Sequence, residues 1–299
     1  VLFRSLDNPI EPIRVLRQVY QAQRDFDAVY CLTGALMCLN AANDEEKQVF
    51  EYLRKGVPPK AEETLNEELW SEVSHPNLSG PLAQLLTVLY RNAYDFVSFA
   101  PKELGLRKKD RIDVRSSDLY FARIADHVGR VLTVRHFDLY RKSGSIEPLH
   151  ILPSKPPALA AGENSDVFRD PSARVVLFHA GRQIAYMRPE MFLARVHVGE
   201  DLRHMLLGLC LVYNRNLQHD ADPQAVEQWA AHFAKVPAAV LQRLQAPARD
   251  AYPVLAQSKS IATYAAAVEA TAARAGLIAC GDLSAAIRGV SEGGEGASG

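Results

Sequence analysis

The sequence has few of the residues that hold metal ions or form disulfide frameworks. It contains four cysteines and nine histidines among 299 residues, and no HxH, HxxH, HxxxH or CxxC pair occurs among them. A zinc site needs three or four well-placed His, Cys or carboxylate side chains. The cysteines lie in apolar stretches, which predicts buried, reduced thiols. We therefore expect no metal and no other cofactor.

Long apolar runs are also missing. The longest candidate, Met205 to Tyr213, is far shorter than the roughly 20 residues that a membrane-spanning helix needs. Asp7, Glu11 and Arg14 interrupt the start of the chain, so we expect no signal peptide. The formal net charge is -1, from 34 basic and 35 acidic residues, which gives no electrostatic reason to expect nucleic acid or an anionic membrane as a partner. These absences favour a soluble, cytoplasmic protein.

The composition is 48% hydrophobic and 23% charged, which is typical of a globular protein. The length favours two domains. We expect a helical region over residues 1–112, a second domain over residues 113–290 and a disordered tail rich in Gly, Ser and Glu over residues 291–299.

Apolar residues at helical spacing predict a pair of helices between Pro12 and Gly56. Asp25 is the expected N-cap of the second helix. Residues 18–28 resemble the junction between the two helices of a tetratricopeptide repeat. The resemblance implies a concave surface that binds other proteins. A single repeat cannot bury its own faces, so it must cap a longer array or pack on the helices that follow.

The rest of the chain predicts helices with one small β-sheet, so the fold class is mainly α with a small sheet (α+β). Short segments at 134–141, 149–152 and 158–161 predict two or three strands. A helix over residues 119–132 is expected to precede these strands. Ser116, Ser117 and Asp118 are its expected N-terminal cap. We place the domain boundary near the basic loop 104–111, which we interpret as a solvated connector rather than an anion site. Helices are expected at 44–55, 62–74, 81–99, 119–132, 170–187, 199–213, 223–234, 237–246, 258–277 and 282–290.

Two of these helices carry a family resemblance. Residues 176–189 read VLFHAGRQIAYMRP and residues 268–277 read VEATAARAGL. With the order of helix, sheet, helix and helical return over residues 116–290, they resemble the gluzincin metallopeptidases of the prenyl-protease and HtpX type. In that family one helix carries HExxH, whose two His bind zinc while the Glu activates water, and a later helix carries a third ligand in an ExxAD setting. Myxobacterial chains that join tetratricopeptide-like helices to such a degenerate region look similar to this one.

The resemblance implies a vestigial site. Gly181 stands in place of the first His, Arg182 in place of the catalytic Glu, and Ala185 in place of the second His. Of the ExxAD residues, Glu269 is kept and Ala273 replaces the Asp. Two amphipathic core helices of an unrelated fold are the alternative interpretation.

The residue chemistry argues against zinc at this site. Arg182 would bring a cation to the metal position, where it would repel zinc but could pair with Glu269. His179 lies two residues before the first-ligand position, which turns it by about 200° around the helix, so it cannot replace that ligand. We predict an Arg182–Glu269 ion pair in place of a metal bridge between the two helices.

Two function classes follow. The first is a non-catalytic interaction or scaffold protein, with an unidentified protein partner and an inactive metallopeptidase-like domain. The alternative is a peptidase-like hydrolase with an unrecognised site, for which Glu269, His179 and His204 are the polar candidates. His197 and His204 are seven residues apart near Asp201, and we expect both to be surface histidines. The missing ligand set favours the first class, a non-catalytic pseudo-metallopeptidase, over the hydrolase, and leaves the question of enzymatic activity open.

Overall fold

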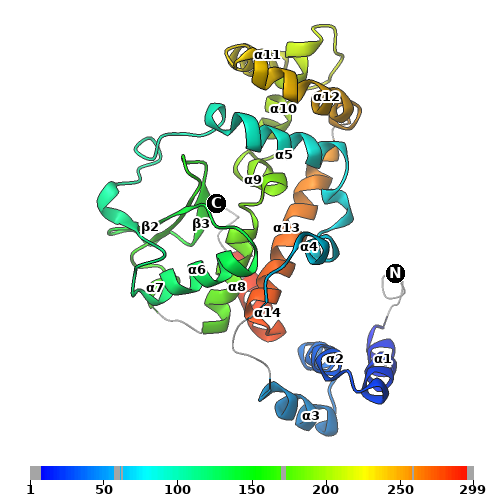
Figure 1. Cartoon of the computed structure of the whole chain (residues 1–299). Coiled ribbons are helices and arrows are strands. Elements are labelled where there is room, and N and C mark those ends of the chain that lie inside the picture. Colours follow the sequence, from blue (N-terminus) through cyan, green and yellow to red (C-terminus); the bar gives the residue numbers. More distant parts are fainter. Residues whose placement is uncertain (1–7, 57–60, 62, 170–172, 258, 295–299) are drawn as a thin grey trace.

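The structure is a computed structural model that describes residues 8–56, 61, 63–169, 173–257 and 259–294 (Figure 1). It is mainly helical with one small mixed sheet, which confirms the predicted fold class. The α-helices before the sheet are α1 (Ile10–Gln23), α2 (Phe26–Cys38), α3 (Asp44–Arg54), α4 (Glu67–Val73), α5 (Pro81–Ala93) and α6 (Tyr120–Val131). Those after it are α7 (Asp166–Arg169), α8 (Ala173–Ala185), α9 (Pro189–Val196), α10 (Glu200–Tyr213), α11 (Pro223–Phe233), α12 (Ala238–Leu255), α13 (Ser260–Cys280) and α14 (Leu283–Gly294).

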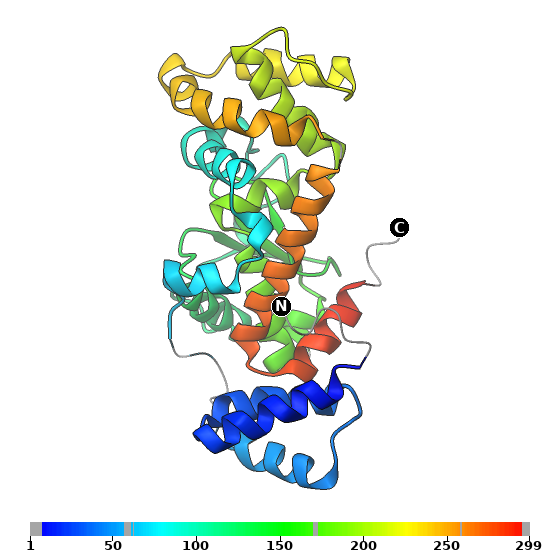
Figure 2. The same cartoon turned by 90° about the vertical axis from the view of Figure 1, so that its right-hand side faces the viewer.

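The first three helices form a unit at one end of the molecule (Figures 1 and 2). Helix α2 packs between α1 and α3 and also contacts α14. The predicted cap is confirmed, since the Asp25 side chain accepts a hydrogen bond from the Ala28 amide. Tyr30 and Phe50 stack with ring centroids 5.0 Å apart and join α2 to α3. The helix pair α1–α2 thus packs on helices that follow it in the chain. This is one of the two arrangements expected for a single repeat.

One large hydrophobic core joins most of the elements after α3, and a second, small cluster contains Leu106, Tyr140, Ala158 and Ala160. The large core begins at Trp70 in α4 and ends at Ala286 in α14. Helix α5 packs on α9 and α12, so elements from both sides of residue 112 share this core. The domain boundary expected near residue 112 therefore separates elements that share one hydrophobic core.

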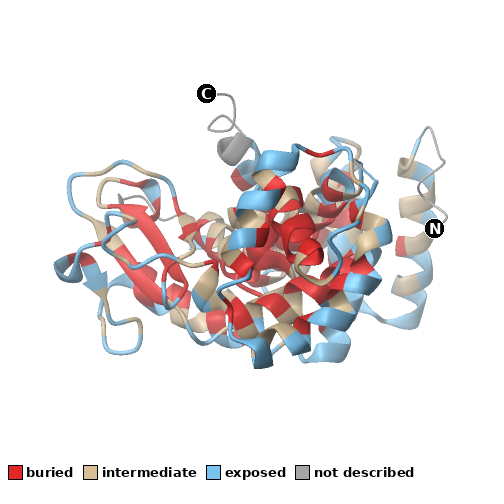
Figure 3. Cartoon of the chain, turned by 90° about the horizontal axis from the view of Figure 1, so that it is seen from above, coloured by how far each residue is buried: buried red, intermediate tan, exposed pale blue. Residues whose placement is uncertain are grey.

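The small sheet has four strands in the order β1-β2-β4-β3. Strands β2 and β4 run parallel, and β1 and β3 are antiparallel edge strands. All five residues of β4 are buried, and much of the sheet is coloured as buried in Figure 3. The three predicted strands are present, and a fourth short one was missed. The strands are β1 (Arg111–Ile112), β2 (Asp138–Lys142), β3 (His150–Leu152) and β4 (Ala158–Gly162).

Several predicted helix boundaries were wrong because tertiary packing outweighs local signals. Helix α12 does not stop at residue 246 but continues past Pro247 and Pro253. Its positions Leu244, Ala248, Ala251 and Leu255 recur at helical spacing and are fully buried. This buried stripe offsets the cost of proline inside a helix.

Other boundaries differ at turns and caps. Asp118 does not cap α6, which begins at Tyr120 without a side-chain cap. Helix α4 begins only at Glu67, where Asn66 supplies the cap. Pro189 ends the preceding segment as expected but also starts α9, an unpredicted helix, because proline suits the first helical turn. Helix α14 extends four residues into the tail predicted to be disordered, and residues 295–299 lie outside the described part.

A buried charge network holds the first three helices together. Glu46 is 1% exposed and accepts hydrogen bonds from Arg14 Nε at 3.0 Å and from the Asn43 amide at 2.8 Å. Arg17 is also buried, with its Nε 4.0 Å from Glu46 Oε1. Burial opposes the charge on Glu46, but the Arg14 and Asn43 hydrogen bonds outweigh it and hold the pKa of this carboxyl below its usual value.

Removal of this carboxyl should loosen the three-helix unit. Glu46→Ala leaves the buried Arg17 without its counter-charge, which should cost about 3 kcal/mol. We expect amide hydrogen exchange in residues 10–54 to become on the order of 100-fold faster. Glu45→Ala is the matched control, because Glu45 is exposed and adjacent. Equal exchange rates in the two variants would contradict a stabilising network at Glu46.

Candidate functional site

The site suggested by the sequence lies where α8 crosses α13. These two helices lie side by side in both views (Figures 1 and 2) and form the most extensive helix contact in the described chain. Helix α8 supplies Gly181, Arg182 and Ala185, and α13 supplies Glu269. The structure thus brings together the helices that carry the four expected site residues.

The predicted Arg182–Glu269 ion pair is present. Arg182 Nη2 donates to Glu269 Oε2 at 2.7 Å. Tyr186, in the turn directly after α8, donates its hydroxyl to the same oxygen at 2.6 Å and accepts from Arg182 Nε at 3.1 Å. Arg195 from α9 lies 3.7 Å from Glu269 Oε1. One carboxylate therefore holds three side chains, which come from α8, from the turn after it and from α9.

The same contacts set the charge state of Glu269. Burial alone would raise its pKa, but hydrogen bonds from Tyr186 and Arg182 outweigh burial and lower the pKa below the usual value. Burial raises the pKa of Tyr186, and the neighbouring carboxylate adds to that rise. Glu269 is therefore a fixed anion and Tyr186 a fixed donor at neutral pH. This state suits a structural ion pair better than proton transfer, which favours a pKa near the working pH.

Sequence reasoning missed Tyr186 and Arg195, which complete the network. Tyr186 follows Ala185 directly and is fully buried. The Arg195 guanidinium lies 5.0 Å from the centre of the Tyr186 ring. The only available signal was the i, i+4 spacing of Arg182 and Tyr186, which puts both side chains on one helix face.

The first-ligand position has no room for a side chain. A Cβ on Gly181 would lie 2.7 Å from the Ala279 Cβ and 2.9 Å from the Gly276 Cα. Gly276 is equally enclosed, with Phe178 2.8 Å from the position of an added Cβ. Small residues thus let α8 and α13 approach closely. A histidine at position 181 would require the helices to move apart.

The donor set does not fit a zinc ion. Of the expected ligand positions only Glu269 offers a donor atom, and Arg182 already binds it. Within the described residues, no group of three or more His, Cys, Asp or Glu side chains is arranged to hold a metal ion. A cation–carboxylate pair and glycine–alanine packing occupy this part of the interface.

The other polar candidates have separate surroundings. His204 in α10 has its Nε2 3.8 Å from Glu200. The ring of His179 in α8 lies edge-on to Phe178, with centroids 5.7 Å apart. Glu269 is bonded to arginine and tyrosine side chains instead, so the structure does not assemble the three into an acid–base set.

His197 corrects one expectation, because it is buried rather than on the surface. Its Nδ1 lies 2.7 Å from Asp201 Oδ2 one turn away, and its ring packs edge-on against Trp229. The apolar Trp229 face explains the burial, and Asp201 satisfies one ring nitrogen. His197 thus fastens α10 to α11.

A serine motif near the C-terminus was also overlooked. Residues 289–293 read GVSEG and fit GxSxG. The nucleophile elbow with this pattern sits on a turn between a strand and a helix. Ser291 instead lies inside α14 and donates its hydroxyl to the Ile287 carbonyl at 3.0 Å. Its setting is that of an ordinary helical serine.

Neither a protein family, nor a curated protein, nor a solved structure matches the chain. The two family resemblances therefore depend on the sequence motifs alone. Among the described residues, no helix combines the length and the apolar character that crossing a bilayer requires.

The ion pair makes a prediction about acid stability. Glu269→Gln should lower the free energy of unfolding at pH 7 by about 1 kcal/mol, a modest value because the carboxyl is 41% exposed and partly screened. The folded pKa of Glu269 is depressed, so its contribution is complete above the unfolded pKa of about 4.3 and is lost as the pH falls through the folded pKa.

The measurement is urea unfolding of the wild type and Glu269→Gln from pH 7 to pH 3. The difference between them should stay constant down to about pH 4.3 and shrink below it. Glu72→Gln, on an exposed face of α4, is the control and should show no such difference. A gap that widens on acidification would contradict the depressed pKa.

Proposed function

We propose that this chain is a non-catalytic interaction protein, in which tetratricopeptide-like helices bind a protein partner and an inactive metallopeptidase-like region forms the rigid body. The observation that carries the proposal is the Arg182–Glu269 pair. It joins the positions that correspond to the catalytic Glu and the third zinc ligand of the resembled family. An arginine paired there supports a scaffold that has exchanged metal chemistry for stability.

The packing of α8 on α13 supports the same proposal. A peptidase needs an open groove between its metal-binding helices for water and substrate. Here Gly181 and Gly276 lie at a contact where even a methyl group would clash. Closed packing of this kind is a feature of a structural core.

The surface of α1 supports binding to another protein. Helix α1 packs mainly on α2, and its outer face leaves Val15 57% and Val19 45% exposed. Phe26, at the start of α2, is 54% exposed. Isolated exposed apolar residues are common, but two at i, i+4 spacing with an aromatic residue nearby in sequence are the kind of anchor that protein interfaces use.

The metal content tests the non-catalytic part of the proposal. Purified protein, dialysed without chelator, should carry far less than one zinc per chain by elemental analysis. It should not cleave unfolded casein, and Arg182→Ala should behave identically. Stoichiometric zinc that resists dialysis, or casein cleavage that Arg182→Ala abolishes, would overturn the proposal in favour of a hydrolase.

Partner capture tests the interaction part. The tagged chain is used as bait in a lysate of the organism that encodes it, and bound proteins are identified by mass spectrometry. Val15→Asp/Val19→Asp should lose the partner, because it puts two charges into the proposed contact. Ile146→Asp/Val198→Asp is the matched control, since these apolar residues are even more exposed but lie elsewhere. A partner that both double variants retain, or both lose, would contradict binding through α1.

A further inference from the structure

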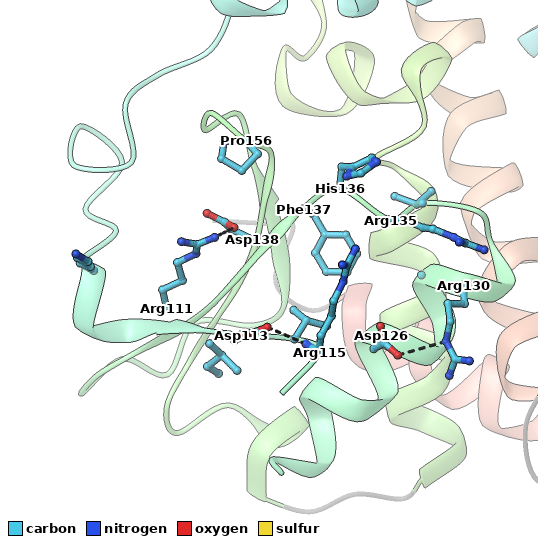
Figure 4. Close-up of a pocket in the computed structure, with 15 residues that line it drawn as sticks. Arg111, Asp113, Arg115, Asp126, Arg130, Arg135, His136, Phe137, Asp138 and Pro156 are labelled. Carbon is cyan, nitrogen blue, oxygen red and sulfur yellow. Dashed lines mark hydrogen bonds and ion pairs between the residues drawn. The ribbon is translucent and has the colours of Figure 1, made fainter. Parts of the chain in front are cut away.

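A cavity of about 840 Å³ lies away from the α8–α13 contact (Figure 4). Its walls come from the segment 108–115, from α6 and from the segment 134–138 that leads into β2. The volume falls in the range of small-molecule sites, about 300–1,000 Å³. Its charged and imidazole side chains are Lys108, Arg111, Asp113, Arg115, Asp126, Arg130, Arg135, His136 and Asp138.

The lining carries an excess of positive charge. Five Lys and Arg side chains face three Asp side chains, an excess of two before His136 is counted. Two of the aspartates are used by neighbouring arginines: Arg111 Nη2 lies 2.6 Å from Asp138, and Arg130 Nε lies 3.3 Å from Asp126. Dashed lines in Figure 4 mark hydrogen bonds and ion pairs between the residues drawn, and the Arg130–Asp126 pair is one of them.

The third aspartate is committed to its own turn. Asp113 accepts hydrogen bonds from the Arg115 amide at 3.0 Å and from the Ser116 hydroxyl at 2.7 Å. These bonds lower the pKa of its carboxyl. Within the described residues, no carboxylate therefore pairs with the guanidinium groups of Arg115 and Arg135, which are both exposed.

The backbone holds the two sides of the cavity in place. Thr133, with a φ of 58°, turns the chain after α6, and the Val134 amide bonds back to the Gly129 carbonyl at 2.8 Å. A Cβ on Gly129 would lie 2.7 Å from the Val134 carbonyl oxygen and 3.2 Å from the Phe137 ring. Glycine at this position lets residues 134–137 lie directly against α6. Arg135 and His136 are thereby carried to the cavity wall.

We infer that this cavity binds a small molecule that carries two or more phosphate groups. Guanidinium groups bind phosphate oxygens through paired, charge-assisted hydrogen bonds, and Arg115 and Arg135 are free to make them. A polyphosphate would also neutralise the excess of two positive charges. The ring of Phe137 and the side chains of Ile112 and Val114 form the apolar part of the lining.

This assignment does not depend on the proposed function, because it involves neither α1 nor the α8–α13 contact. It also revises the interpretation of the basic loop as a solvated connector. Lys108 and Arg111 of that loop line the cavity together with residues of α6 and of the segment before β2.

Isothermal titration calorimetry with ATP, tripolyphosphate and adenosine tests the assignment. ATP and tripolyphosphate should both bind the full chain with one site, and their affinity should fall as salt rises. Adenosine, which lacks phosphate, should not bind. Tighter binding of ATP than of tripolyphosphate would identify a nucleotide as the source of the phosphates, and equal binding would identify an inorganic polyphosphate.

The variant Arg115→Ala/Arg135→Ala should weaken ATP binding at least tenfold, since it removes two guanidinium groups that can form charge-assisted hydrogen bonds to phosphate. Arg123→Ala/Arg288→Ala is the control of equal charge, because both arginines are exposed and lie outside the cavity. Circular dichroism should show unchanged folding in both double variants. Absence of phosphate binding to the wild type, or equal weakening by both variants, would overturn the inference.

Discussion

The close contact between α8 and α13 is the constraint on which the rest of the fold depends. Gly181 and Gly276 bring the two helices nearer than any larger side chain would allow. Helix α6 packs on α8, α9 packs on α13, and α14 contacts both. Because interiors are close-packed, a change of one methyl group at this contact would displace several elements. The three-helix unit at the N-terminus is attached through α14 and depends on the same contact.

This contact also determines the chemistry available beside it. Where glycine and alanine fill the interface, no space remains for an imidazole side chain at position 181. Longer side chains fit only beside the small residues, and there Arg182, Tyr186 and Glu269 form their network. The carboxylate is held ionised by its donors, and the tyrosine is held protonated by burial. The arrangement joins helices and offers no group poised for proton transfer.

Much of the fold and one contact of the site could be predicted from the sequence. Helical periodicity identified most helices, and the apolar frame of residues 176–189 placed Arg182 well enough to predict its pair with Glu269. The predicted helix boundaries were wrong where tertiary packing determines the end of the helix. Helix α12, for example, continues past Pro247 because its stripe of buried residues also continues. Tyr186 and Arg195 could not be assigned to the site from the sequence, since only the tertiary structure brings their side chains to the Glu269 carboxylate. The cavity could not be predicted from the sequence for the same reason. Its cationic side chains come from two segments about 20 residues apart, and only the tertiary structure brings them together.

The two charged regions of the molecule differ in a way that separates structure from function. At α8–α13 both arginines, Arg182 and Arg195, lie within ion-pair distance of the Glu269 carboxylate. In the cavity Arg115 and Arg135 remain unmatched although Asp113, Asp126 and Asp138 lie in the same walls. Stability alone would favour carboxylates opposite both arginines, because like charges in a concave site repel one another. Each nearby aspartate is instead fixed to another donor. This excess of positive charge in the lining favours an anionic ligand for the cavity.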